Sequence, residues 1–330
     1  MKPMLLTVDN LTTEFRAARG IARPVDGVSF SLETGQSMAL VGESGCGKTM
    51  TALSIIGLVP YPGRITGGRV LFEGRDLASL SAEEVRRIRA REIGVIFQDP
   101  LTTLNPAYRI GDQIAESILA GEDRSFSPLI RRRRRRAALD SAVKAMDEVG
   151  IAAAAERARH YPHEFSGGMR QRAMIAAAMA RRPALLIADE PTTALDVTIQ
   201  AQILDLLREA RERLGTALLL ITHDLGIVAD LCQTVAVMYA GQVVEQCEVK
   251  HLISEPLHPY SRALLDCVPS LDRLGERFHT IGGSVPEITA LSPGCRFAER
   301  CPKVVDVCHE QIPAIHTASD GREVRCHLYG

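Results

Sequence analysis

The stretch Phe165-Ser166-Gly167-Gly168-Met169-Arg170-Gln171-Arg172 stands shortly before an apolar run, Leu185-Leu186-Ile187-Ala188, that ends in Asp189-Glu190. Ser166 can cap the helix that follows, and the two glycines allow the backbone to approach a phosphate group closely. The free N–H groups at the start of such a helix form an anion site. An ordinary helix cap could have the same sequence, so the order of the other motifs has to decide between these two interpretations.

A phosphate-binding motif lies upstream, where residues 42–49 read Gly-Glu-Ser-Gly-Cys-Gly-Lys-Thr. It stands between an apolar strand expected at 37–41 and a helix expected at 48–58, which is the context that a phosphate loop requires. Lys48 would reach the β- and γ-phosphates, and the Thr49 hydroxyl would bind magnesium. The predicted ATP-binding residues of the loop are Gly42, Glu43, Ser44, Gly45, Cys46, Gly47, Lys48 and Thr49.

The two carboxylates at the end of the apolar run are candidates for catalysis. From a strand end, Asp189 can hold magnesium through water, and Glu190 can act as the general base for the attacking water. The alternative is an acidic pair that caps a helix. Pro191 and the apolar strand argue against that alternative.

Length and composition limit the class of protein. The chain has 330 residues, 46% of them hydrophobic, and a formal net charge of −1. This length suffices for one large and one smaller domain. No apolar run approaches the roughly 20 residues of a membrane helix and no secretory signal is recognisable, so we expect a soluble, cytosolic chain. The net charge gives no reason to expect nucleic acid as a partner.

Strands alternate with helices along most of the chain, which predicts an α/β fold. The pattern is helical from about residue 106 to residue 180, and Ser127-Pro128 is a typical helix start. After about Glu248, prolines and cysteines become frequent, and we expect a small appended domain there. Strands are expected at 5–8, 27–32, 37–41, 69–72, 94–97, 184–188, 217–222, 234–238 and 243–245.

Taken in order, these motifs resemble those of the ATP-binding cassette (ABC) ATPases over about residues 5–245. The resemblance implies a phosphate-loop ATPase core with an antiparallel β subdomain and an inserted helical subdomain at about 100–182. It also implies roles for single residues. Gln98 would sense magnesium and the membrane partner and take part in catalysis, and His223 would lie at the γ-phosphate. Phe15 would stack on adenine, although a core aromatic residue is the alternative.

In this family the Ser-Gly-Gly turn caps the ATP bound to a second ATPase. ATP would then hold two subunits together, and hydrolysis would release them. Ala194-Leu195-Asp196 resembles the D-loop, which also faces the partner. The residues implied to contact the partner's ATP are Ser166, Gly167, Gly168, Met169 and Asp196.

Three features are similar to the oligopeptide/dipeptide importer ATPases. The segment at 98–106 resembles the part that faces the membrane subunit, Met169 replaces a glutamine, and His258-Pro259-Tyr260-Ser261 precedes Leu264-Leu265 and Pro269. The resemblance implies the first ATPase subunit of such an importer, at the cytoplasmic face of the inner membrane. Its partners would be a different second ATPase, two permease subunits and an extracytoplasmic peptide-binding protein. The nucleotide-binding domain would span 1–248 and the C-terminal region 249–330.

The C-terminal region contains four cysteines, Cys295, Cys301, Cys308 and Cys326, separated by 5, 6 and 17 residues. Zinc sites usually show cysteines two to four positions apart, so this spacing argues against a zinc ribbon. Spacing alone leaves a metal site and ordinary buried thiols open. The family resemblance implies a four-iron, four-sulfur cluster on these four residues, with a structural or a redox-sensing role.

Six consecutive arginines, Arg131 to Arg136, would cover every face of a helix start. A solvated helix start is one interpretation. Contact with anionic lipid or an acidic partner is another, and nucleic-acid binding is a third.

The transported substrate cannot be read from this chain. Importers of nickel, glutathione, opines or antimicrobial peptides use similar ATPases. Functions of other classes are a soluble ABC ATPase that acts on nucleic acid or ribosomes and a redox-sensing module.

Overall fold

The computed structural model describes residues 3–17, 20–121, 128–193, 195–268, 280–289 and 291–330. The chain divides into two compact units. The first comprises Met1–Leu5, Glu33–Gln36 and Leu77–Leu219, and the second comprises Leu6–Leu32, Ser37–Asp76 and Leu220–Gly330. Strand β8, Ala217–Thr222, runs from the first unit into the second.

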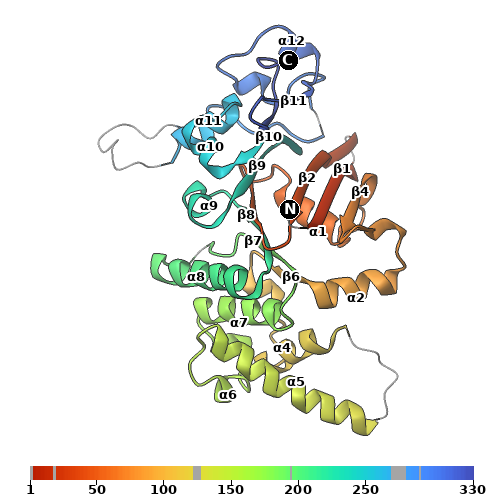
Figure 1. Ribbon diagram of the computed structural model, residues 1–330, viewed down its shortest axis with the longest axis vertical. Coiled ribbons are helices and arrows are strands. Elements are labelled where there is room, and N and C mark those ends of the chain that lie inside the picture. The colour runs from red at the N-terminus through yellow and green to blue at the C-terminus, as the bar shows by residue number, and fades with distance from the viewer. Residues whose placement is uncertain (1–2, 18–19, 122–127, 194, 269–279, 290) are drawn as a thin grey trace. The chain divides into compact units, whose positions relative to one another are not determined.

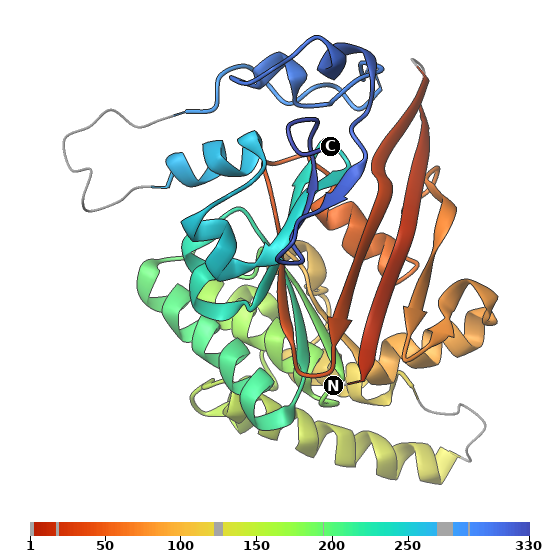
Figure 2. The same ribbon diagram turned by 45° about the horizontal axis from the view of Figure 1, so that its top comes forward.

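The second unit contains an antiparallel sheet with the strand order β2-β1-β4-β5. Figure 2 shows its two long strands, β1 and β2, side by side. Both are much longer than the predicted strands at 5–8 and 27–32, because pairing extends them through neighbouring polar residues. The bounds are Met4–Ala17 for β1, Gly20–Glu33 for β2, Arg64–Phe72 for β4 and Arg75–Asp76 for β5.

A second sheet in this unit has the order β11-β12-β10-β9-β3. Strand β3 is buried along its whole length and parallel to β9, as expected for the centre of an α/β sheet. The chain turns from β9 into β10, and the C-terminal strand β12 pairs with the other edge of β10. The bounds are Ser37–Val41 for β3, Thr234–Tyr239 for β9, Gln242–Glu248 for β10, Ile315–Thr317 for β11 and Glu323–Arg325 for β12.

Short helices complete the second unit. The first of them follows the phosphate loop directly, and the others lie in the C-terminal third of the chain. They are α1 (Lys48–Ile55), α9 (Leu225–Leu231), α10 (Val249–Ser254), α11 (Pro259–Asp266) and α12 (Val307–Glu310).

The first unit combines two parallel strands, β6 (Ile93–Ile96) and β7 (Leu185–Asp189), with helices. Helices α4, α5 and α7 pack on one another, as Figure 1 shows, which confirms the predicted helical part of the chain. Helix α5 begins at Pro128 as predicted, while Ser127 lies outside the described residues. The helices are α2 (Ala82–Glu92), α3 (Pro100–Thr103), α4 (Ile110–Leu119), α5 (Pro128–Glu148), α6 (Ala154–Arg157), α7 (Gly167–Met179) and α8 (Val197–Leu214).

Helix α2 was not expected from the sequence. Its start is fixed by a capping box, in which the Ser81 hydroxyl accepts from the Glu84 N–H and the Glu84 carboxylate accepts from the Ser81 N–H. Among the described residues, none of the helices combines the length and the apolar character that crossing a membrane requires.

Candidate nucleotide site and its supports

The loop at 42–49 connects β3 to α1 in the second unit, as the sequence predicts. Three of its glycines have positive φ angles: 152° at Gly42, 79° at Gly45 and 107° at Gly47. A Cβ atom on Gly47 would lie 1.9 Å from the Pro24 carbonyl oxygen, and one on Gly42 would lie 2.2 Å from the Met238 carbonyl oxygen. Glycine is therefore required at both positions by backbone conformation and by space.

Lys48 and Thr49 stand at the start of α1, where helix N–H groups have no partner within the helix. Lys48 is buried, and its Nζ donates to the carbonyl oxygens of Gly42 at 2.7 Å and Glu43 at 3.0 Å. The exposed residues of the loop are Ser44, Gly45 and Thr49. The glycine-rich loop, the Lys48 ammonium group and the exposed Thr49 hydroxyl are the groups that bind the phosphates of a nucleotide together with magnesium.

Glu43 is held by two residues from the C-terminal part of the second unit. The Tyr260 hydroxyl accepts from the Glu43 N–H at 2.9 Å, and the Arg300 guanidinium donates to both Glu43 carboxylate oxygens at 2.8 and 2.9 Å. The sequence singled out Tyr260 only as part of His-Pro-Tyr. Nothing in the sequence pointed to Arg300, which contacts a loop that lies more than 250 positions away along the chain.

In the first unit, β6 and β7 bring Gln98 and Glu190 together. Because the strands are parallel neighbours, the residues that follow their carboxyl ends meet at one edge of the sheet. The Gln98 Nε2 donates to Glu190 Oε2 at 3.0 Å, and the Thr193 hydroxyl donates to the same oxygen at 2.8 Å. Asp189, the last residue of β7, is 3% exposed. No motif in the sequence pointed to the contribution of Thr193.

The Ser-Gly-Gly turn opens α7 as predicted. The Ser166 hydroxyl caps this helix by accepting from the Met169 N–H at 3.3 Å, and Ser166 and Gly167 are exposed. Gly168 is close-packed, since a Cβ atom there would lie 3.0 Å from Ile199. Asp196 caps α8 through the Ile199 N–H at 2.9 Å, whereas Ala194 lies outside the described residues.

His223 and Phe15 belong to the second unit. His223 is exposed and directly follows β8. Phe15 is half-buried, and its ring packs on Gly63, where a Cβ atom would lie 2.4 Å from the ring. This packing accounts for the aromatic residue structurally, and stacking of Phe15 on adenine stays a prediction.

The four C-terminal cysteines lie in one region. The Cys295 N–H donates to the Cys308 carbonyl oxygen at 2.7 Å. Burial, together with the neighbouring thiols of Cys308, Cys326 and Cys301, raises the pKa of Cys295 to about 11. Yet in the described part of the chain no three His, Cys, Asp or Glu side chains are arranged to hold a metal ion. The thiols are therefore neighbours without forming a metal-binding group.

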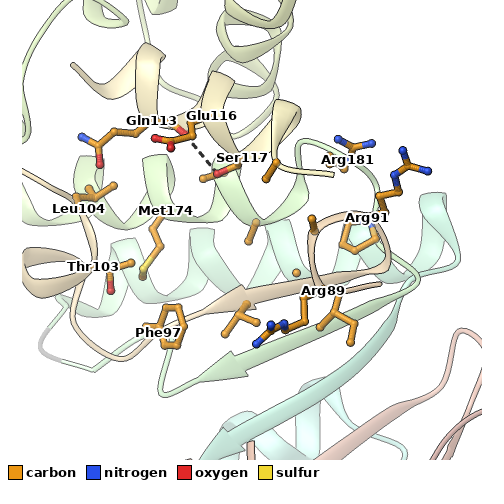
Figure 3. Close-up of a pocket in the computed structure, with 18 of the residues that line it drawn as sticks. Arg89, Arg91, Phe97, Thr103, Leu104, Gln113, Glu116, Ser117, Met174 and Arg181 are labelled. Atoms are coloured by element: carbon orange, nitrogen blue, oxygen red, sulfur yellow. Dashed lines mark hydrogen bonds between the residues drawn. The ribbon is translucent and has the colours of Figure 1, made fainter. Parts of the chain in front are cut away.

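A groove of about 740 Å³ crosses the first unit between β6, α2, α4 and α7. Figure 3 shows Phe97 and Met174 at this groove, with Gln113 and Leu104 toward one end and Arg91 and Arg181 toward the other. The segment after Gln98 provides part of its wall through Thr103, Leu104 and Asn105. Leu101 and Tyr108, on the same segment, are 63% and 59% exposed.

Comparison with known proteins assigns the family. Residues 25–193 match the family described as ABC transporter, and residues 244–308 match the family described as oligopeptide/dipeptide transporter, C-terminal region. The chain belongs to the ATP-binding subunits of oligopeptide/dipeptide ABC transporters. It is 46% identical to the oligopeptide transport ATP-binding protein AppD of Bacillus subtilis, over 98% of this chain and 97% of AppD. It is 43% identical to OppD of Salmonella typhimurium, over 98% of this chain and 93% of OppD.

Solved ABC ATPase structures confirm the predicted fold. The ATP-binding cassette MJ0796, in a dimeric post-hydrolysis state bound to ADP and Pi, aligns with a TM-score of 0.63 and 26% identity, over 74% of this chain and 99% of that one. The predicted family, the α/β core, the antiparallel sheet and the helical part are thus all confirmed. As a member of the ABC ATPases, the chain would use ATP and Mg²⁺.

Proposed function

We propose that this chain hydrolyses ATP to drive the import of dipeptides or oligopeptides through an ABC transporter. One observation carries the proposal: the phosphate loop, the Ser-Gly-Gly turn and the His-Pro-Tyr region occur in one chain that is 46% identical over nearly its full length to a dipeptide transport ATP-binding protein, DppD of Bacillus subtilis. Related importers of nickel, glutathione, opines or antimicrobial peptides are the alternative for the substrate.

Different residues of the candidate site take different roles in ATP binding and hydrolysis. The phosphate loop and Lys48 would bind the phosphates of ATP, and Thr49, Asp189 and Gln98 are the residues that would hold Mg²⁺, whose charge would offset that of the phosphates. Glu190 accepts a proton from the attacking water. Its carboxylate is fixed for this task, because Gln98 and Thr193 both donate to Oε2. His223 would act at the γ-phosphate.

The Ser-Gly-Gly turn acts on the ATP of a second ATPase subunit. Its exposed position at the start of a 13-residue helix suits an anion presented by another molecule. Ser166, Gly167, Gly168, Met169 and Asp196 would contact that ATP. We infer that the second subunit is a different ABC ATPase.

The groove in the first unit is the proposed contact with the permease subunits. Its wall contains the segment that follows Gln98, so a permease element seated there would be coupled to the Gln98–Glu190 pair. The apolar side chains of Phe97, Leu104 and Met174 suit an apolar face of such an element. This contact would hold the chain at the cytoplasmic face of the inner membrane, in a complex that also uses an extracytoplasmic peptide-binding protein.

Reconstitution of the full importer tests the function. We expect the chain to copurify with two permease subunits and a second ATPase, and its ATP turnover to rise when a peptide-loaded binding protein is added. Lys48→Ala should abolish this turnover, because the variant loses the ammonium group that contacts the phosphates. Stimulation by nickel, glutathione or an opine instead of peptides would identify that compound as the transported substrate. Copurification with ribosomes or nucleic acid alone would contradict the proposal.

A four-iron, four-sulfur cluster on Cys295, Cys301, Cys308 and Cys326 belongs to the same proposal. The proximity of the four thiols supports it, and the side chains would have to turn toward one another to bind the cluster. Anaerobic purification should give a brown protein with an iron–sulfur absorbance band that Cys308→Ser removes. A colourless, zinc-containing protein would exclude the cluster, and a loss of ATPase activity on oxidation would indicate a redox-sensing role.

A further inference from the structure

Glu43 introduces a negative charge into the loop that binds the phosphates of ATP. Its side chain is 28% exposed, so water reaches it only in part. An uncompensated charge at this position would repel a triphosphate. The loop therefore needs a nearby cation besides Lys48, and the contacts of the second unit show which residue supplies it.

Arg300 supplies that charge from a short 3-10 turn at Ala298–Arg300. Its side chain is only 4% exposed, and it binds Glu43 with two parallel hydrogen bonds, the geometry in which arginine holds a carboxylate most firmly. The remaining guanidinium N–H groups are also engaged. They donate to the Gly282 carbonyl oxygen at 2.8 Å, the Tyr239 hydroxyl at 3.2 Å and the Ile281 carbonyl oxygen at 3.4 Å.

A buried aromatic cluster holds Arg300 in place. The rings of Tyr239, Tyr260 and Phe297 pack with centroids 4.6 to 5.3 Å apart, and the Arg300 guanidinium lies 5.7 Å from the Tyr239 ring centroid. All three rings are at most 2% exposed. Because the cluster is fully packed, neither Arg300 nor the Tyr260 hydroxyl has room to move away from Glu43.

The residue that is held is also the one that positions the lysine. The Glu43 carbonyl oxygen accepts from Lys48 Nζ at 3.0 Å, while the Glu43 N–H donates to Tyr260. The C-terminal region therefore holds the Glu43 side chain and backbone N–H, while the backbone carbonyl of the same residue accepts from Lys48. A shift of Glu43 would displace an acceptor of the lysine.

We propose that Arg300 and Tyr260 are positioning residues for ATP binding: Arg300 neutralises the Glu43 carboxylate, and both residues fix the phosphate loop in the conformation that receives the phosphates. This inference rests on the proposed function, since it concerns the same ATP site. It assigns a task in ATP binding to a C-terminal region that contains none of the phosphate-binding motifs.

The test compares full-length variants by their KM for ATP, their kcat and their affinity for a fluorescent ATP analogue. Arg300→Gln should raise KM about tenfold, the effect of losing a hydrogen-bonded charge partner, with kcat changed less than about twofold. Tyr260→Phe keeps the ring and removes the acceptor, so its KM should rise about threefold. Arg300→Lys, which retains the charge without the two-pronged geometry, should fall between Arg300→Gln and the wild type.

Two further variants separate this role from a general structural one. Arg322→Gln is the matched control, because Arg322 also lies in the C-terminal region, has a side chain that is only 11% exposed, and pairs with Asp320 at 2.7 Å, away from the loop. We expect its KM to equal that of the wild type. Glu43→Gln removes the charge that Arg300 compensates, so the double variant Arg300→Gln with Glu43→Gln should recover most of the lost affinity.

An unchanged KM in Arg300→Gln, or a KM rise that Arg322→Gln reproduces, would overturn the inference. So would a double variant as weak as Arg300→Gln. A wild-type chain that binds no ATP would instead contradict the proposed function, so the two failures are distinguishable.

Discussion

Glu190 has a left-handed backbone conformation, with φ of 45°, directly after a fully buried strand. A non-glycine residue in this region carries strain that persists only where its surroundings fix it, and such residues occur often at functional sites. Here Gln98 and Thr193 fix the side chain through the same carboxylate oxygen. The structure therefore holds the Glu190 carboxylate in place through two donors to the same oxygen, Oε2.

Replacement of the proposed base should separate ATP binding from hydrolysis. We expect Glu190→Gln to lower kcat at least about 100-fold with little change in ATP affinity, because the amide keeps the size but cannot accept the proton. The variant should form a stable ATP-bound dimer, visible by size-exclusion chromatography. Glu209→Gln on the exposed side of α8 is the control. Wild-type turnover in Glu190→Gln would exclude Glu190 as the base.

His258 gives the fold a dependence on pH. Its Nδ1 accepts from the Tyr260 N–H at the start of α11, and burial lowers the pKa of its imidazole to about 3, from 6.5. Below pH 6.5 the unfolded chain therefore binds a proton that the folded chain excludes. Stability is lost as the pH falls from there toward 3.

The expected cost is about 1.4 kcal/mol of unfolding free energy between about pH 7.5 and about pH 5.5. His258→Asn keeps an acceptor for the helix cap but cannot titrate. Between the same two pH values, the variant should therefore lose less unfolding free energy than the wild type, by that amount. Denaturant unfolding of both proteins at the two pH values measures the difference. Equal losses would show that His258 does not titrate on unfolding.

At the level of elements, α5 begins with the run of arginines. The side chains from Arg132 to Arg136 are exposed or half-exposed, and Leu129 before them is 81% exposed. Arg135 pairs with Asp112 of α4 at 3.0 Å, a surface ion pair of small energetic value. These contacts agree with a solvated helix start and leave the run available to an anionic surface.

Glutamine at all five positions 132–136 should leave basal ATPase activity within about twofold of wild type, because exposed substitutions rarely cost more than about 0.5 kcal/mol. Binding to vesicles that contain anionic lipid should decrease if the run contacts headgroups. A collapse of basal activity would contradict a surface role, and unchanged vesicle binding would leave the helix start as a solvated element.

At the level of the whole molecule, the second unit combines segments from the N-terminal and the C-terminal thirds of the chain. Strand β12 pairs with β10, and Arg300 and Tyr260 reach the phosphate loop near the N-terminus. The C-terminal region is therefore integrated with the nucleotide-binding core of its unit. The exposed Ser-Gly-Gly turn of the first unit, in contrast, has partners outside the chain in the proposed function.

A substitution in the turn should affect assembly while ATP binding is retained. Ser166→Arg should leave the affinity of the isolated chain for an ATP analogue within about twofold, because its own phosphate loop is intact, but lower the turnover of the assembled importer at least about tenfold. Ser141→Arg, at an exposed serine of α5, is the matched control. If Ser166→Arg lowered analogue binding by the isolated chain as much as it lowered turnover, the turn would contact the ATP bound to the same chain.

Neighbouring residues in the sequence were enough to predict the local features of this protein: the glycine-rich phosphate loop, the Ser166 cap, the buried strand that ends at Asp189, and the family to which they belong. These follow from neighbouring residues, because backbone conformation and helix capping are set within a few positions. Three features emerge only when the chain is folded: the full length of β1 and β2, the hydrogen bonds from Gln98 and Thr193 to Glu190, and the ion pair of Glu43 with Arg300. Such contacts depend on which strands become neighbours, and no local pattern in the chain encodes the meeting of residues 43 and 300.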